Sequence, residues 1–301
     1  MRLVLRIRSV ITSVALITTV AASAQSGVPE FERYGQISVS SSNQSAALPG
    51  GGLIFFTEDE SERITDGSFF SYDSRLAFSG LDRDGNDQTM FFDGTGYAQG
   101  DYGIIKTRYQ GGLYNSFFSE LNPLRYDSVN EIYDPFGTPD VIQGVASAGW
   151  VDEVVYGGTA TGYLATYVFR ITGSNQNVKS FSLLDVNVGD SGFQRFTFFN
   201  SGTVDRVVRT TPVFIGQDGL KTRVGMTSIF QPNMAELVDG VDFFGDSNFA
   251  NTVELVGIEL KDEFGNLVTD VSLYGASGTV YSAVPEPGII VLLGGLGAAF
   301  G

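Results

Sequence analysis

Apolar and polar residues alternate along much of this chain, with the two-residue period that places successive side chains on opposite faces of a β-strand. The stretch TGYLATYVFRITG (161–173) shows this alternation clearly, and YGIIKTRYQ (102–110) repeats it. We therefore predict a strand at each place, with one face turned toward a core. The positions expected to share one face of residues 161–173 are Tyr163, Ala165, Tyr167 and Phe169.

Glycine-centred turns separate further strand-like runs. Residues 178–202 predict two strands around GDSG, and residues 204–230 predict two more around GQDG. The clearest hairpin covers residues 253–275, with Gly265-Asn266 at its turn, because these two residue types tolerate positive φ. In this hairpin we expect a second strand from Leu267 to Tyr274. The residues expected to oppose it are Val253, Leu255, Gly257 and Glu259.

Helical patterns are scarce, with one short helix predicted in residues 232–241 and one turn in residues 116–124. Regularly spaced strands without intervening helices favour antiparallel sheets stacked on each other. We predict an all-β fold, a jelly-roll-like antiparallel β-sandwich, with a closed barrel as the main alternative. The small and polar run from Ser38 to Gly52 is expected to be a surface or mobile loop.

The first 24 residues have the layout of a secretory signal peptide. Arg2, Arg6 and Arg8 form a basic start, an apolar stretch follows, and Ala22 and Ala24 supply the small residues that precede a cut. We therefore predict an N-terminal signal helix in residues 1–24 that signal peptidase removes. The mature protein is expected to be exported.

Composition excludes several classes of chemistry. The chain has neither histidine nor cysteine, which removes His-based triads, Cys nucleophiles and disulfides. It carries 18 basic and 34 acidic residues, and the predicted signal peptide contains three of the arginines and none of the acids. Such acidity argues against nucleic acid as a partner, because that binding depends on Lys and Arg. We expect no catalytic residues and no enzyme activity.

The segment LDRDGNDQTMFFD (81–93) gathers oxygen-bearing side chains of the kind that Ca²⁺ binds. The candidate metal ligands are Asp82, Asp84, Asn86 and Asp87. Asp93 stands at the twelfth position from the first of them, but the glycine is fourth rather than sixth in the loop. A hairpin turn beside Gly85, in which Asp and Asn bind backbone groups, is the alternative interpretation. Apart from Ca²⁺, no cofactor is expected.

Other polar patterns favour structural interpretations. A surface loop is predicted for residues 239–251, and a β-turn at Ser191, because no histidine is present to activate that hydroxyl. Asp152 and Glu153 are neighbours on a predicted strand and point to opposite faces, so they do not form the facing carboxyl pair of a glycoside hydrolase. Trp150 is expected to pack in the core. The polar residues of the surface loop predicted at 239–251 are Asp239, Asp242, Asp246 and Asn248.

The sequence Val284-Pro285-Glu286-Pro287-Gly288 precedes an apolar, glycine-rich run. This arrangement resembles the PEP-CTERM sorting signal of exported proteins from Gram-negative bacteria. In that family the Pro-Glu-Pro motif precedes a transmembrane helix and an Arg-rich end. The run from Ile289 to Gly301 has 13 residues and no Arg cluster after it, whereas about 20 apolar residues span a bilayer. The anchor is therefore expected to be truncated or degenerate, and a proline-rich linker is the alternative interpretation.

The resemblance implies that exosortase, a membrane cysteine protease, recognises Val284, Pro285, Glu286 and Pro287. It also implies transient membrane attachment through the C-terminal tail and a final place at the cell envelope, at the outer surface or in the medium. Family members come from bacteria that make exopolysaccharide in biofilms. With the signal peptide, the resemblance divides the chain into residues 1–24, a body of residues 25–283, and a sorting segment of residues 284–301.

Three functions are compatible with these sequence features. The leading prediction is a non-enzymatic, exported surface or matrix protein associated with exopolysaccharide. The alternative is a carbohydrate-binding ectodomain, with Ca²⁺ in the segment from Asp82 to Asp87. A carboxylate-based glycan hydrolase comes third, because no two acids are placed across a cleft by the sequence.

Overall fold

The computed structural model describes residues 31–44, 55–81, 86–116, 126–127, 132–133, 141–158, 162–176, 180–189, 193–199, 201–232 and 240–283. All elements in these ranges are β-strands, so the all-β prediction is confirmed there. The predicted signal helix, the C-terminal tail and most of both predicted helical stretches lie outside the described residues. Within the described ranges, no helix has the length and apolar character needed to cross a membrane.

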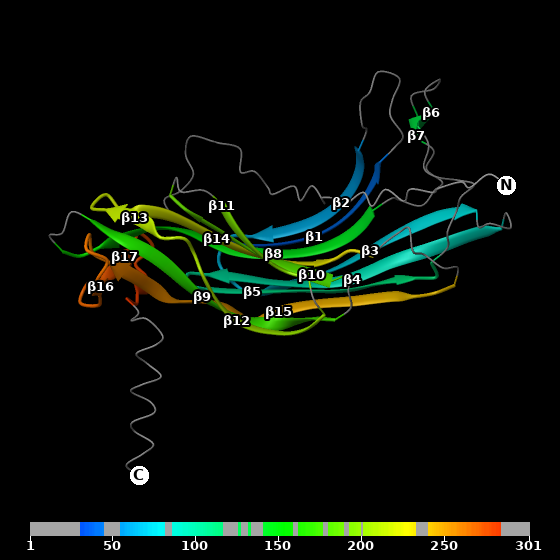
Figure 1. Cartoon of the computed structure of the whole chain (residues 1–301). Coiled ribbons are helices and arrows are strands. Elements are labelled where there is room, and N and C mark those ends of the chain that lie inside the picture. The colour runs from blue at the N-terminus through cyan, green and yellow to red at the C-terminus, as the bar shows by residue number, and fades with distance from the viewer. Residues whose placement is uncertain are drawn as a thin grey trace, which may run out of the picture.

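Two antiparallel sheets lie one above the other (Figure 1). The first sheet has the strand order β11-β10-β14-β8-β1-β2, with β17 beside β8 and β18 beside β17. Its strands are β1 (Glu32–Gln44), β2 (Phe55–Ile64), β8 (Val141–Tyr156), β10 (Ser180–Val188), β11 (Phe193–Phe198), β14 (Leu220–Phe230), β17 (Leu273–Gly275) and β18 (Val280–Tyr281).

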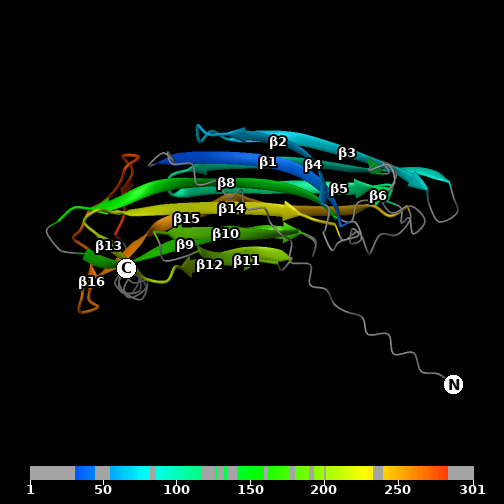
Figure 2. The same cartoon turned by 90° about the horizontal axis from the view of Figure 1, so that it is seen from above.

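The second sheet has the order β12-β9-β15-β5-β4-β3, with β13 paired to β9 and β16 paired to β15. Seen from above, its strands run along the same direction as those of the first sheet (Figure 2), as in aligned sandwiches. Its strands are β3 (Phe70–Leu81), β4 (Asp87–Asp101), β5 (Ile104–Tyr114), β9 (Gly162–Gln176), β12 (Gly202–Arg209), β13 (Val213–Gly216), β15 (Phe243–Lys261) and β16 (Leu267–Val268). The short strands β6 (Tyr126–Asp127) and β7 (Ile132–Tyr133) pair with each other.

The core lies between the two sheets and takes alternate residues from both. On β9, Ala165, Tyr167 and Phe169 of the predicted inward face are buried and Tyr163 is half-buried. Of the opposite face, Leu164 and Arg170 are exposed but Val168 is buried, so the prediction is confirmed except at Val168. Phe92 of β4 stacks on Phe230 of β14 with ring centroids 5.8 Å apart, and so joins the layers. Burial of each such ring stabilises the fold by about 1.5–3 kcal/mol relative to exposure.

Hydroxyl pairs also bridge the two sheets inside the core. The pairs are Thr107 Oγ1 with Ser228 Oγ (2.8 Å), Ser182 Oγ with Ser247 Oγ (2.6 Å), and Tyr167 Oη with Thr222 Oγ1 (2.8 Å). All six side chains are buried, and a buried hydroxyl without a partner would cost about 1–3 kcal/mol. Burial raises the pKa of Tyr167 well above its ordinary value, so this phenol stays neutral at physiological pH.

Trp150 packs in the core as predicted. Its side chain is 1% exposed. The indole stacks on Tyr281 with centroids 6.1 Å apart and meets Tyr102 edge-on at 6.5 Å. The single tryptophan of the chain therefore lies beside the C-terminal strands, and its fluorescence can report on their packing.

Two sequence-based boundaries are corrected by the sheets. Residues 38–44 belong to β1 rather than to a loop, because β1 is bonded to β2 on one side and β8 on the other. Hydrogen bonding to a strand on each side stabilises the extended conformation here, although the small, polar residues of this run have low strand propensity. Residues 204–230 contain three strands, β12, β13 and β14, instead of two. The GQDG turn carries the chain from β13 in the second sheet to β14 in the first.

The hairpins are confirmed in part. Strands β10 and β11 pair on either side of GDSG as predicted, as far as Asn187 opposite Phe193. The turn at Gly265-Asn266 is also present, with Gly265 at φ +82°. However, the long partner strand from Leu267 to Tyr274 is wrong, because only β16 returns along β15, and β17 joins the first sheet instead.

Candidate functional site

The Asp-rich segment 81–93 connects β3 to β4. These strands pair as far as Leu81 opposite Asp87, which supports the hairpin interpretation. Asn86 and Asp87 are exposed, while Asp82 and Asp84 lie outside the described residues. Among the residues that the structure describes, no group of three or more His, Cys, Asp or Glu could hold a metal ion. Calcium binding by Asp82, Asp84, Asn86 and Asp87 therefore stays a prediction.

The second acidic segment is mostly strand and not the predicted loop, because β15 begins at Phe243. Three of the four polar residues named for the predicted loop are described, and their contacts are separate and do not converge on one point. Asp242 Oδ1 accepts from Asn115 N (2.9 Å), Asp246 pairs with Arg108, and Asn248 Oδ1 accepts from Ala250 N (3.2 Å). Asp239 and Ser191 lie outside the described residues.

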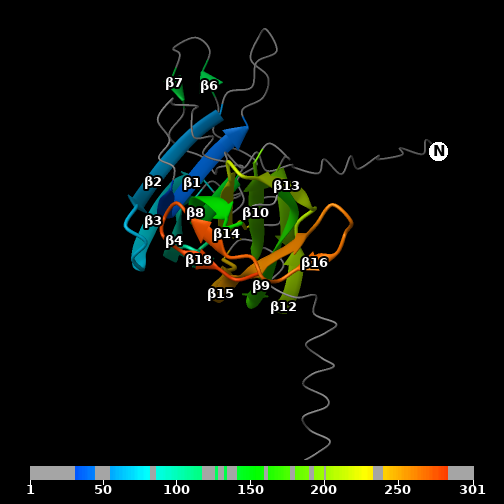
Figure 3. The ribbon, with the colours of Figure 1, turned by 90° about the vertical axis from the view of Figure 1, so that its left-hand side faces the viewer.

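The predicted processing residues Ala22, Ala24, Val284, Pro285, Glu286 and Pro287 also lie outside the described residues. The described body reaches Ala283, which forms a parallel bridge with Ile258 of β15. Ile258 N also donates a hydrogen bond to Ser282 O at 3.0 Å. In the end view of Figure 3, β16 and β18 lie at the near end of the sandwich. The chain is thus tied to the body up to the residue before Val284.

Asp152 holds this C-terminal end by hydrogen bonds from inside the core, and we call these contacts the Asp152 clamp. It is fully buried, and, as predicted, its neighbour Glu153 points the other way. Oδ2 accepts hydrogen bonds from Ser277 Oγ and Tyr281 Oη, both at 2.6 Å, and Oδ1 accepts from Ser277 N at 3.0 Å. A Cβ at Gly275 would collide with this carboxylate. Burial, reinforced by the bond to Asp152, raises the pKa of Tyr281 above its ordinary value.

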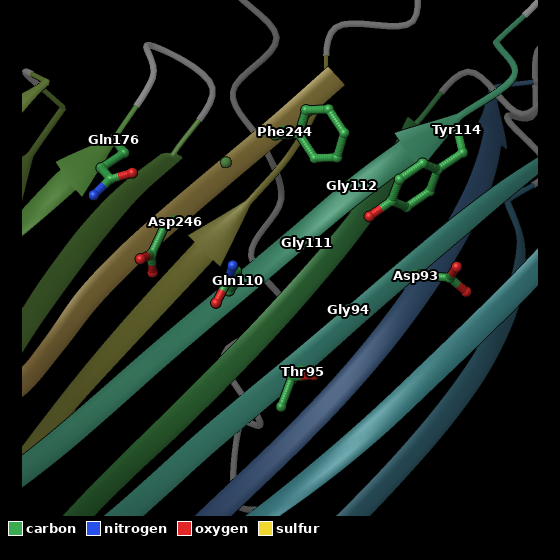
Figure 4. A pocket seen from close by; sticks show the side chains of 11 residues that line it. Asp93, Gly94, Thr95, Gln110, Gly111, Gly112, Tyr114, Gln176, Phe244 and Asp246 are labelled. Carbon is green, nitrogen blue, oxygen red and sulfur yellow. The ribbon is translucent and has the colours of Figure 1, made fainter. Parts of the chain in front are cut away.

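An open groove of about 450 Å³ lies on the outer face of the second sheet (Figure 4). It crosses β4, β5 and β15 and reaches Gln176 at the end of β9. The side chains that line it alternate along β4 and β5 with core residues such as Phe92 and Tyr109, which point the other way. The side chains that define this outer-sheet groove are Asp93, Gln110, Tyr114, Phe244 and Asp246, with Gly112 between them.

Two aromatic rings form one end of the outer-sheet groove. Tyr114 and Phe244 meet edge-to-face, with centroids 5.2 Å apart, and Phe244 is 53% exposed. Gly112 makes this approach feasible, because a Cβ there would lie 2.9 Å from an atom of each ring. The groove therefore presents an apolar surface beside polar groups.

Charged groups in the groove are paired. Arg108 Nε and Nη2 donate to Asp246 Oδ1 and Oδ2 at 3.0 and 2.8 Å, and Nη2 also donates to Gln110 Oε1 at 2.9 Å. The bond to Asp246 raises the pKa of Arg108 above its ordinary value. Arg75 Nε lies 3.2 Å from Asp93 Oδ1. These contacts fix the orientation of the carboxylates and of the Gln110 amide, and leave the groove close to neutral.

This arrangement is suited to binding a ligand that has both hydroxyl groups and apolar faces. A glycoside hydrolase needs one carboxylic acid that donates a proton and a second carboxyl group about 5–10 Å away. Asp93 and Asp246 are each held in an ion pair with a guanidinium.

No protein-family model matches the chain, and no curated protein matches it either. The function proposed for this chain therefore rests on its residues and their geometry.

Sequence reasoning did not find the outer-sheet groove or the Asp152 clamp. The alternation in β4 and β5 marks Asp93, Gln110 and Tyr114 as outward-facing, but not which of them are neighbours. That depends on the register, which pairs Asp93 with Gly112 and Gln110 with Asp246. Asp152 and Tyr281 are far apart in sequence, and no local pattern joins them.

Proposed function

We propose that this chain is an exported bacterial surface or matrix protein, non-enzymatic, that carries a C-terminal PEP-CTERM sorting signal. Signal peptidase removes residues 1–24, and exosortase recognises Val284, Pro285, Glu286 and Pro287. The C-terminal tail holds the precursor at the membrane until it is processed. The mature body is then placed at the cell envelope or outer surface, or is released, where it associates with exopolysaccharide in a biofilm.

One structural observation supports this order of events. The body is bonded to its own C-terminal residues as far as Ala283, and Val284 follows directly in the sequence. A protease that cuts at or after the motif would therefore leave the bridge at Ala283 and the Asp152 contacts in place. Processing at this position and retention of the fold are compatible.

Replacement of Glu286 tests the proposal. In a host that contains exosortase, we expect Glu286→Ala to leave unprocessed, membrane-held precursor, whereas the wild type is cut. Glu263→Ala is the matched control, because Glu263 is an exposed acid in the β15–β16 turn. Equal processing of the wild type and Glu286→Ala, measured by immunoblot of membrane and released fractions, would contradict the proposal.

A second candidate function is carbohydrate binding by the body. The outer-sheet groove favours it, because Tyr114 and Phe244 offer aromatic surface beside the ordered polar groups of Gln110 and Asp246. Carbohydrate binding is compatible with export and sorting, since a matrix protein associates with exopolysaccharide. Calcium in the Asp82–Asp87 segment is not required for this groove.

A further inference from the structure

We propose that the outer-sheet groove binds an extended, neutral glycan chain. This inference rests on the second candidate function, carbohydrate binding, and names its site and the class of its ligand. It does not depend on how the protein is sorted.

The first support is the aromatic end of the groove. The hydrogens on one face of a sugar ring form an apolar surface, and an exposed aromatic ring covers such a surface well. Phe244 is 53% exposed and is held by Tyr114 at 5.2 Å. Because packing already orders both rings, little side-chain entropy is lost when a ligand covers them.

The second support is the set of ordered polar groups next to the rings. Arg108 holds both Gln110 Oε1 and the carboxylate of Asp246, so the side-chain amide of Gln110 has a defined orientation. An oriented amide and a carboxylate together offer a donor and acceptors, which matches the hydroxyl groups of a sugar. The arrangement fixes a ligand by a few directed hydrogen bonds, as small-molecule sites do.

The third support is a second aromatic pair on the same outer face. Phe69 stacks on Tyr97 with centroids 5.9 Å apart, and Phe69 is 53% exposed. Arg108 lies over the Tyr97 ring at 5.9 Å. Tyr97 is six residues along β4 from Phe91, the cross-strand partner of Tyr114, a distance of about 20 Å at 3.3 Å per residue. Aromatic surfaces at both ends of a polar strip fit an extended chain better than a single sugar.

Charge decides the class of glycan. The whole chain has 16 more acidic than basic residues, and the two carboxylates of the groove are each already paired with an arginine. A polyanionic polysaccharide would therefore meet long-range repulsion and no unpaired cation among these groove residues. A neutral polysaccharide meets neither obstacle.

The test is affinity electrophoresis of the purified full-length chain in gels that contain soluble neutral polysaccharides (dextran, galactomannan or xyloglucan) or alginate as the polyanion. We expect at least one neutral polysaccharide to retard the wild type and alginate not to. Phe244→Ala and Gln110→Ala should each weaken retardation by about tenfold, the loss of one central contact. Phe214→Ala is the matched control, because Phe214 is 60% exposed on β13 of the same sheet but outside the groove.

Both groove residues are exposed, so their variants are expected to fold, and thermal unfolding checks this. Wild-type retardation of both folded variants would overturn the groove assignment while leaving carbohydrate binding intact. Failure of every neutral polysaccharide to retard the wild type would overturn both the groove assignment and carbohydrate binding by the body. Stronger retardation by alginate than by the neutral polymers would overturn the ligand class.

Discussion

Asp152 is a fully buried carboxylate whose described partners are neutral hydrogen-bond donors. Two of these donors, Ser277 and Tyr281, lie more than 120 residues further along the chain. A buried charge is tolerated only where hydrogen bonds replace those of water. The residue therefore ties β8 to the last strands of the body, immediately before the proposed sorting motif.

Asp152→Ala is expected to lower the free energy of unfolding by about 2–4 kcal/mol, because it leaves several buried donors without their acceptor. Tyr281→Phe removes one bond and should cost about 1 kcal/mol. Denaturant unfolding followed by the fluorescence of Trp150, which stacks on Tyr281, measures both. Wild-type stability of Asp152→Ala would show that the clamp contributes nothing.

At the scale of single residues, the sequence predicted the burial of particular side chains but not the contacts of Asp152 and of the groove. Trp150 and the inward face of β9 follow from the pattern of neighbours along one strand. The contacts of Asp152 and Gln110 depend on residues that only the fold brings close, so no local pattern contains them.

At the scale of elements, the neighbours of β15 could not be predicted from the sequence. The strand is 19 residues long and has β5 on one side and β9 on the other. On its β5 side, β5 pairs only as far as Glu254, and Ser282 and Ala283 bond the same edge at Ile258. These segments occupy the edge where the predicted hairpin partner of residues 253–259 would pair, although the turn itself was identified correctly. Local residues determine a turn, whereas the neighbour of a strand is decided by burial on the whole sheet.

The β15–β16 turn carries a pH-dependent contact. The side chain of Asn266 donates to Asp262 Oδ2 at 2.9 Å, and the backbone amides of Phe264 and Asn266 donate to Oδ1. The side-chain bond from Asn266 is the main cause that lowers the pKa of Asp262 below its ordinary 3.8. The stabilisation that the ionised Asp262 carboxylate gives the folded turn is therefore fully present above the unfolded pKa. It is lost as the pH falls through the lower pKa of the folded state.

We expect an NMR titration of the Asp262 carboxyl carbon to give a midpoint below 3.8. Asn266→Ala should move this midpoint upward, since it removes the side-chain donor. Asp262→Asn should remove the acid-induced shift of the Phe264 and Asn266 amide signals. A midpoint at or above 3.8 in the wild type would contradict the assigned contacts.

At the scale of the whole molecule, two antiparallel sheets enclose one core, and the outer face of one sheet carries the groove. The fold class was predictable because strand periodicity and scarce helical signals are properties of the sequence itself. The strand order was not, since long-range pairing is not encoded locally, and the jelly-roll description stays a prediction. The same holds for export, because the two predicted signals lie outside the described residues.

The most direct test of the proposed sorting is to map both ends of the mature protein by mass spectrometry after expression in an exosortase-containing host. We expect an N-terminus at Gln25 and a C-terminus beyond Ala283 but before the end of the apolar run, so that the Asp152 contacts survive. A mature protein that keeps residues 1–24, or that keeps the whole of residues 284–301, would contradict it.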